Sequence, residues 1–239
     1  MNSALQLKVL ISGGFSGAYE QLLPEFESTS GIKVVTGSGA SQGAGPQTIA
    51  AQLARGVPAD VVILSREGLT ELIVANRIRA GTDVDLARVP LGVAVRTGTP
   101  RPDVSSVAAF KEALLKAATV AVPASTSGIW LMTDLFPRLG FADKIKVQAM
   151  PRGSDATKLV AAGGSELAIM PVSEIVHAAG IDFAGPIAPE IQFVQTFSAA
   201  VVAGSAEIEA SQMLIGFLTS ARAAEAIRKS GMEPPANAG

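Results

Sequence analysis

The sequence of 239 residues contains no cysteine, one histidine, one tryptophan and one tyrosine. The lack of cysteine excludes disulfides, thiol nucleophiles and cysteine-ligated metal sites. No apolar run approaches the length of about 18 residues that a membrane-spanning helix needs. The net charge of −2 gives no long-range attraction for nucleic acid or for an anionic membrane. We therefore expect no nucleic-acid partner and no insertion into a membrane.

What the chain does contain is typical of an ordered globular protein, because 48% of its residues are hydrophobic and 17% are charged. Short apolar runs alternate with stretches of helical periodicity. The predicted strands are Leu7–Ile11, Lys33–Thr36, Val61–Leu64, Leu91–Arg96, Thr119–Val122, Lys146–Ala149, Leu167–Pro171 and Gln192–Ala203. The predicted helices are Gly17–Thr29, Gln47–Arg55, Glu67–Ala75, Val107–Ala117, Gly128–Leu139, Asp155–Ala162, Ser173–Ala179, Ile208–Ser220 and Ala221–Lys229. This alternation predicts an α/β fold with mostly parallel sheets covered by helices.

Two segments break the alternation of strands and helices. Val89–Val95 follows a pause at Gly81–Arg88, and Phe193–Val202 is a long β-rich run without an obvious helix before it. If both segments cross between lobes, the two ends of the chain combine in one lobe and the middle forms the other. We therefore predict a discontinuous lobe I of residues 1–88 plus 201–239 and a lobe II of residues 89–200 that includes the hinge strands.

Two loops of small residues precede predicted helices. Gly37–Gly45 carries few side-chain atoms beyond hydroxyls and one amide, and Pro46 suits the first position of a helix. Ser12–Ser16 follows the first strand and precedes a helix that we expect to begin near Ser16. Backbone N–H groups can approach a ligand closely in such loops, and the helix N-terminus behind them favours negative charge. The pattern predicts an anion-binding site.

Four segments of the chain resemble the type II periplasmic solute-binding proteins, specifically their molybdate-binding-protein-like branch. They match the family's opening strand and helix, its "PAD" strand, its third ligand-contacting loop, and a late strand and turn. In that order they are Leu7–Val34, Gln52–Ser65, Ser125–Ile145 and Gly164–Ile175. The resemblance implies two α/β lobes joined by two crossing strands, which close on a small ligand in an inter-lobe cleft. It also implies export to the periplasm and an ABC permease as partner, and we expect a monomer.

Three departures from the molybdate binders fall where an oxyanion would be held. Gly14 stands where those proteins usually place a serine, and the loop Gly37–Gly45 is longer than their Ser-Ser turn. Pro171 replaces a tyrosine that often ends the late strand. We therefore expect a small organic anion, a carboxylate, as the ligand. A molybdate or tungstate binder is the alternative.

Two arginines are candidates for holding a carboxylate, because a guanidinium binds one bidentately. Arg66 follows a strand end, and Arg152 lies in a turn before a helix. The alternative is that both are solvated surface residues, as most arginines are. The full set of candidate ligand-binding residues is Ser12, Gly14, Phe15, Ser38, Ser41, Gln42, Ser65, Arg66, Ser125, Thr126, Ser127, Arg152, Ser154, Pro171 and Ser173.

The hydroxyls in this set have structural explanations as well. One of Ser125, Thr126 and Ser127 is expected to cap the following helix, which leaves two for a ligand at the carboxyl end of a strand. Ser38, Ser41 and Gln42 belong either to the ligand site or to a flexible connection.

An enzyme on the same fold is the rival hypothesis, because some relatives of the molybdate binders isomerise tricarboxylic acids such as aconitate. Such a proton shift needs a base beside a site for carboxylates. Asp155 and Glu174, each at the start of a predicted helix, are the candidate catalytic residues. Their alternative role is to complement the helix dipole. A cytosolic sensor domain is a third possibility.

No cofactor is expected. The spacing Gly37-x-Gly39-x-x-x-Gly43 departs from the dinucleotide fingerprint, and no P-loop motif occurs. No cluster of acids and the single His177 has metal-ligand spacing, so we predict no bound metal. We expect no signal peptide in this sequence, since Leu7–Ile11 already reads as a core strand. Both a periplasmic protein whose signal has been removed and a cytoplasmic protein fit the start Met1-Asn-Ser.

Overall fold

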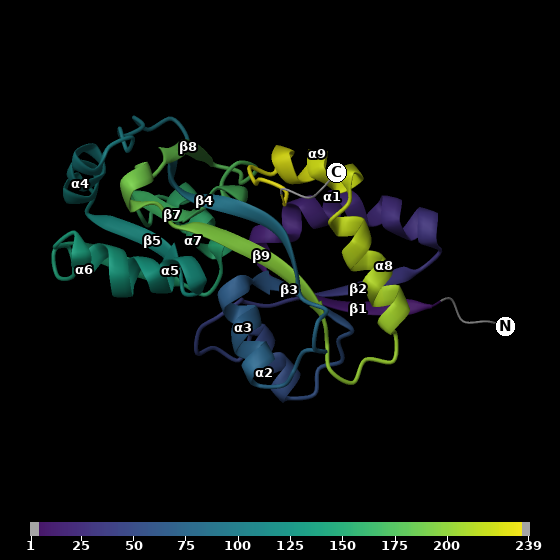
Figure 1. Cartoon of the computed structure of the whole chain (residues 1–239). Helices are drawn as coiled ribbons and strands as arrows, with labels where there is room; N and C mark the ends of the chain where they lie inside the picture. Colours follow the sequence, from purple (N-terminus) through teal and green to yellow (C-terminus); the bar gives the residue numbers. More distant parts are fainter. Residues whose placement is uncertain (1–4, 236–239) are drawn as a thin grey trace. The chain divides into compact units, whose positions relative to one another are not determined.

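The computed structural model describes residues 5–235. The chain falls into two compact units, shown with their elements in Figure 1. Unit 1 consists of Met1–Arg88 and Thr196–Gly239, and unit 2 of Val89–Gln195. Two long strands have residues in both units: they are β4 (Val84–Arg96) and β9 (Val194–Val201).

Unit 1 contains four neighbouring strands in the order β2-β1-β3-β9. Strand β1 pairs in parallel with β2 and β3, whereas β9 runs antiparallel to β3 and places Phe197 opposite Ser65. All five residues of β3 are buried, as expected for a central strand with both faces covered. The remaining strands are β1 (Gln6–Ile11), β2 (Lys33–Ser38) and β3 (Val61–Ser65).

The part of unit 1 that the structure describes has five helices, and α1 and α3 contact its sheet. Helix α1 contacts both α8 and α9. Val62 and Leu64 share a buried cluster with Leu69 and Leu72, because alternate residues of a strand point to the same face. Figure 1 shows α2 and α3 side by side below β3. The helices are α1 (Gly13–Ser30), α2 (Ile49–Ala54), α3 (Arg66–Val74), α8 (Ile208–Leu218) and α9 (Ala221–Lys229).

Unit 2 has the strand order β4-β7-β5-β6, and a further strand, β8, pairs with β4. Strand β5 is parallel to β6 and β7, and β4 is antiparallel to β7 and β8. These strands are β5 (Thr119–Pro123), β6 (Lys146–Met150), β7 (Leu167–Pro171) and β8 (Ile181–Pro186).

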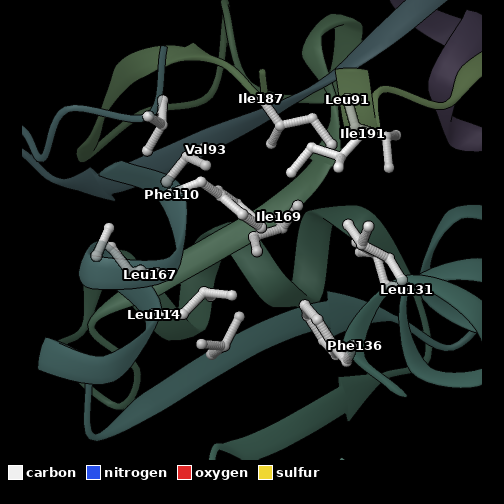
Figure 2. Packing of buried hydrophobic residues seen from close by; sticks show 14 of the residues in the cluster. Leu91, Val93, Phe110, Leu114, Leu131, Phe136, Leu167, Ile169, Ile187 and Ile191 are labelled. Carbon is white, nitrogen blue, oxygen red and sulfur yellow. The ribbon is translucent and has the colours of Figure 1, made fainter. Parts of the chain in front are cut away.

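The two faces of this sheet are packed differently. On one face, large side chains from α4 (Val107–Lys116) and the helical segment Thr126–Arg138 meet the strands, as Figure 2 shows for Phe110, Phe136 and Ile169. On the other face, α7 (Gly153–Ala161) packs on small strand residues, which allow its backbone to approach closely. Those small residues are Ala94, Ala121 and Ala168. Full burial of one Leu or Phe side chain stabilises a fold by about 1.5–3 kcal/mol.

The helical segment Thr126–Arg138 is not one regular helix. It begins as α5 (Thr126–Trp130), widens into a π-helical turn at Leu131–Leu135 and ends as α6 (Phe136–Arg138). Trp130 stacks on Phe193 with 5.0 Å between ring centroids.

The predicted α/β fold is confirmed, and five element predictions are corrected. Strand β4 begins at Val84, inside the segment interpreted as a pause, and β8 was not predicted. The predicted helix Ser173–Ala179 is a single 3₁₀ turn at Val172–Glu174.

The other two corrections concern helix starts. Helix α1 begins at Gly13 and not near Ser16. Helix α2 begins at Ile49, capped by the Thr48 side chain, which accepts a hydrogen bond from Ala51 N. Pro46 is therefore not the first helical residue. A threonine that satisfies a free N–H at the helix start is the stronger signal here.

Candidate functional site

The N-terminus of α1 is the first part of the candidate site. Ser12 is the N-cap residue, and its N–H donates to the carbonyl of Ile63 at 2.8 Å. The residue is only 5% exposed, and its buried hydroxyl has no hydrogen-bond partner within the described residues 5–235. The first N–H groups of a helix have no intrahelical acceptor. An unpartnered hydroxyl and the positive end of an 18-residue helix thus occur together.

Gly14 and Phe15 follow Ser12 and are buried in the first turn of α1. The ring of Phe197 lies against the backbone of Gly14. The structure therefore brings the predicted residues Ser12, Gly14 and Phe15 together at the carboxyl end of β1.

The loop Gly37–Gly45 is tied down by hydrogen bonds within the protein. Gly39 N donates to the carbonyl of Ile11 at 3.0 Å, and Ala40 N donates to that of Gln47 at 3.1 Å. These two N–H groups are already used, so they do not form the predicted cradle for an anion. The same two hydrogen bonds argue against the alternative that the loop is a flexible connection.

The three side chains predicted in or beside this loop lie in different settings. Ser41 is buried, and its Oγ accepts a hydrogen bond from Ser65 N at 2.9 Å. Gln42 donates from Nε2 to Glu71 at 2.5 Å. Ser38 ends β2 and is exposed. Ser41 and Ser65 therefore share the strand end that also carries Ser12, whereas Ser38 is solvated.

Ser65 and Arg66 open α3. Ser65 is fully buried and caps the helix, since its Oγ accepts a hydrogen bond from Gly68 N at 3.2 Å. Arg66 donates from Nε to Asp85 at 2.8 Å and from Nη1 to Asp83 at 2.7 Å, and Nη2 also contacts Asp85. All three nitrogens of this guanidinium meet acids of unit 1. A ligand carboxylate would have to displace an aspartate, so the geometry favours a structural role for Arg66.

Asp85 is the centre of this charge network. Burial opposes ionisation of its carboxyl, but hydrogen bonds from Ser198 and Arg66 outweigh that effect and hold its pKa below the ordinary value. Ser198 Oγ donates to Asp85 at 2.7 Å.

Glu67 is a candidate that the sequence reasoning missed. It lies in the first turn of α3, and its Oε2 is buried without a partner among the residues described. Burial raises the pKa of this carboxyl, against hydrogen bonds from its own backbone and from Ser65. The signal was present in the sequence, because an acid at the start of a helix after a strand also singled out Asp155 and Glu174.

In unit 2, the helix after β5 begins at Thr126, two residues before the predicted start at Gly128. Ser125 is the N-cap of α5 without a side-chain capping bond, and Thr126 and Ser127 form its first turn, each 3% exposed. A Cβ atom at Gly128 would lie 1.7 Å from the carbonyl oxygen of Pro123, so glycine lets this helix pack on the end of β5. The predicted hydroxyls do lie at a strand's carboxyl end.

The N-terminus of α7 meets the carboxyl group of Glu174. A Cβ atom at Gly153 would lie 1.8 Å from Glu174 Oε2 and 2.5 Å from its Cδ. Burial raises the pKa of Glu174 from its ordinary value of 4.5 to about 7. This carboxyl is half protonated near neutral pH and can accept or donate a proton there.

The other predicted residues of unit 2 are close in sequence to Glu174 or to Gly153. Pro171 ends β7 and is buried, and Ser173 Oγ is buried without a partner in the described part of the chain. Arg152 and Ser154 are exposed beside Gly153, and Asp155 lies in the first turn of α7. No role in ligand binding is tested for any of these residues, which stay predictions.

Metal binding and membrane insertion can be checked for residues 5–235. No group of three or more histidine or acidic side chains there is arranged to hold a metal ion. None of the helices in that range is both long and apolar enough to cross a membrane.

Comparison with known proteins gives one family for nearly the whole chain. The model of the family described as bacterial extracellular solute-binding protein matches residues 7–233. The aconitate isomerase of a Pseudomonas species is 36% identical over 229 residues, which is 95% of this chain and 87% of that protein.

Solved structures are similar in fold at lower identity. The periplasmic molybdate-binding protein of Azotobacter vinelandii has a TM-score of 0.78 and 21% identity, covering 96% of this chain and 99% of that one. PEB3 bound to L-phospholactate has a TM-score of 0.70 and 17% identity, covering 96% of this chain and 100% of that one. These likenesses confirm the type II periplasmic-binding-protein fold that the sequence predicted. The chain belongs to the bacterial extracellular solute-binding protein family.

Proposed function

We propose that this protein captures a small organic anion outside the cytoplasm, by way of the ligand's carboxylate, and delivers it as a monomer to an ABC permease. The observation that carries the ligand class is the unpartnered, buried hydroxyl of Ser12 at the N-terminus of α1. A buried polar group without a partner destabilises a protein unless something else bonds to it. A ligand carboxylate would satisfy the hydroxyl and the free N–H groups together.

Neutral donors suffice for such a ligand. A hydrogen bond to a charged group contributes about 1.5–3 kcal/mol, and the helix dipole adds to it. The protein's own net charge of −2 gives no general attraction for anions, so local donors must provide it. Two of the three proteins compared above are consistent with organic acids, since their names refer to aconitate and phospholactate, whereas the third is a molybdate-binding protein.

A thermal-shift panel at fixed pH tests this function. It contains mono-, di- and tricarboxylates together with sulfate, phosphate, molybdate and tungstate. A ligand at 100 times its dissociation constant adds about 2.7 kcal/mol to the free energy of unfolding, which raises the midpoint visibly. A rise with a carboxylate supports the proposal. A rise with molybdate or tungstate alone would favour the metal-oxyanion alternative and contradict it.

A second candidate function is the isomerisation of a tricarboxylic acid such as aconitate. The specific observation is the Glu174 carboxyl on the first turn of α7, with a pKa of about 7, together with 36% identity to an aconitate isomerase. Ionised Glu174 would take a proton from the ligand's CH₂ carbon, the double bond would shift by one carbon, and the proton would return to the former =CH carbon. Atoms and charge balance without an oxidant or another reactant. N–H groups at a helix start would stabilise the negative charge that develops between the two steps.

The turnover test uses trans-aconitate in D₂O, followed by proton NMR. If the second function holds, the cis isomer appears with deuterium at the carbon that receives the proton. Glu174→Gln would then lose on the order of a hundredfold or more in rate. Glu112→Gln, an exposed acid on α4 paired with Lys116, is the matched control. Full turnover in Glu174→Gln would exclude Glu174 as the base. Absence of turnover in the wild type would reject the second function and leave the first unaffected.

A further inference from the structure

Two aromatic rings flank the first turn of α1. Phe15 belongs to that turn and Phe197 to β9, and their exposed fractions are 0% and 1%. Their ring centroids are 6.4 Å apart with an interplanar angle of 42°. Because Phe197 lies opposite Ser65 in the β3–β9 pair, its ring is at the same end of the sheet as the Ser12 hydroxyl.

Gly14 directly precedes Phe15 in the chain, and Phe197 occupies the space of its missing side chain. A Cβ atom on Gly14 would lie 2.1 Å from Cζ of Phe197, 2.7 Å from Cε2 and 2.9 Å from Cε1. Real Cβ atoms do not approach other atoms so closely, so no residue except glycine fits while the ring stays in place. Ring and glycine therefore act as a pair.

The pair limits the number of hydrogen-bond donors at this helix start. Of the residues Ser12–Ser16, only the two serines have hydroxyls. Ser16 Oγ donates to the carbonyl of Gly13 at 2.7 Å, which leaves Ser12. A side chain at Gly14 could have supplied another donor, but the apolar ring of Phe197 excludes it. A free tetrahedral oxyanion has four oxygens that accept hydrogen bonds, whereas a carboxylate group has two and is bonded to carbon.

We propose that the Gly14–Phe197 pair determines ligand specificity: by keeping a donor out of the first turn of α1, it favours a carboxylate on a carbon skeleton over a free tetrahedral oxyanion. This inference rests on the proposed function, because it concerns the same helix start. It adds the residues that set the choice between ligand classes.

The experiment measures the ratio of two dissociation constants by titration calorimetry, one for sulfate and one for the carboxylate that the panel above identifies. Phe197→Leu removes the ring. The double variant Gly14→Ser/Phe197→Ala places a hydroxyl where the ring stood. Phe110→Leu is the matched control, since Phe110 is equally buried, at 1% exposure, in the core of unit 2. The control corrects for loss of core packing, which changes stability but has no reason to change the ratio.

We expect the ratio of the sulfate constant to the carboxylate constant to fall about tenfold or more in the double variant. It should fall less in Phe197→Leu and stay at the wild-type value in Phe110→Leu. If a folded Phe197→Leu protein and the folded double variant both keep the wild-type ratio, the specificity inference is overturned. If the double variant does not fold, the ratio measured for Phe197→Leu alone decides whether the specificity inference stands. A wild type that binds no carboxylate would refute the proposed function itself, which this titration shows before any variant is made.

Discussion

The first turns of α1 and α7 are built alike, but only that of α7 is in contact with a carboxyl group of the protein. Each follows a strand, each starts with glycine, and each presents free N–H groups. At α7 the chain supplies its own acid, because the carboxyl of Glu174 lies on Gly153. At α1 no acid of the first turn is present, and the hydroxyl of Ser12 is left without a partner among the described residues.

The difference indicates two kinds of chemistry. A helix start that lacks an internal anion is suited to holding an external one. A helix start that holds a carboxyl with a pKa of about 7 is suited to exchanging a proton near neutral pH. On the proposed function, the ligand's carboxylate would be held by unit 1, and on the second candidate function turnover would depend on unit 2.

The largest expected effect comes from Glu174→Gln. The pKa of Glu174 is about 7 in the folded protein against an ordinary 4.5, so the folded state binds this proton more tightly than the unfolded state. The resulting stability is present in full below about pH 4.5 and is lost as the pH rises through 7, by about 3 kcal/mol. Glutamine cannot ionise, so the variant should become more stable than the wild type at pH 8.5. Urea unfolding at pH 4.5 and 8.5 measures this, and equal pH dependence in both proteins would contradict it.

Gly153→Ala should have the next largest effect. The added methyl group would overlap the Glu174 carboxyl and push it into water, at a cost of about 1–2 kcal/mol. The pH dependence of stability between pH 4.5 and 8.5 should weaken as well. Gly216→Ala on α8 is the control, because no heavy atom lies within 4 Å of its added Cβ. This control should gain about 0.5–1 kcal/mol, since alanine favours a helix interior. Equal results for the two variants would mean that Glu174 does not lie on α7.

Asp85→Asn tests the charged network of unit 1 and should have the smallest effect. The pKa of Asp85 is below its ordinary 3.8, so its ionised form stabilises the folded state above about pH 4. That stability is lost as the pH falls through the folded pKa, opposite in direction to Glu174. Because both partners are partly exposed, we expect about 1 kcal/mol or less. Urea unfolding at pH 7 and pH 3 should show a deficit at pH 7 only, and an equal deficit at both would contradict the ionic explanation.

The fold could be predicted wherever the pattern along the chain is simple. Val61–Ser65 is apolar up to its last residue and emerged as β3, because a central strand needs no polar face. The first half of β4 was missed, since Asp85 and Arg88 made it look like a loop. In the folded protein, Asp85 accepts hydrogen bonds from Arg66 and Ser198, which satisfy its carboxylate within a strand. The sequence does not show that these residues come together.

The candidate site could be predicted in part for the same reason. Ser12 directly follows β1 and Glu174 lies in the turn after β7, so the order of elements was enough to select them. Phe197 was not selected, because its contact with Gly14 joins two ends of the chain. Arg66 was expected to meet a ligand, yet its partners Asp83 and Asp85 lie beyond the helix that it opens. Pairings of this kind depend on tertiary structure.

The most direct test of the central claim is calorimetric titration of the wild type and of Ser12→Ala with the carboxylate that gives the largest thermal shift. If the N-terminus of α1 holds the ligand, Ser12→Ala should weaken binding by about 1.5–3 kcal/mol. Its own unfolding midpoint should not fall, because the hydroxyl has no partner to lose in the unliganded protein. An unchanged dissociation constant in Ser12→Ala would contradict the account.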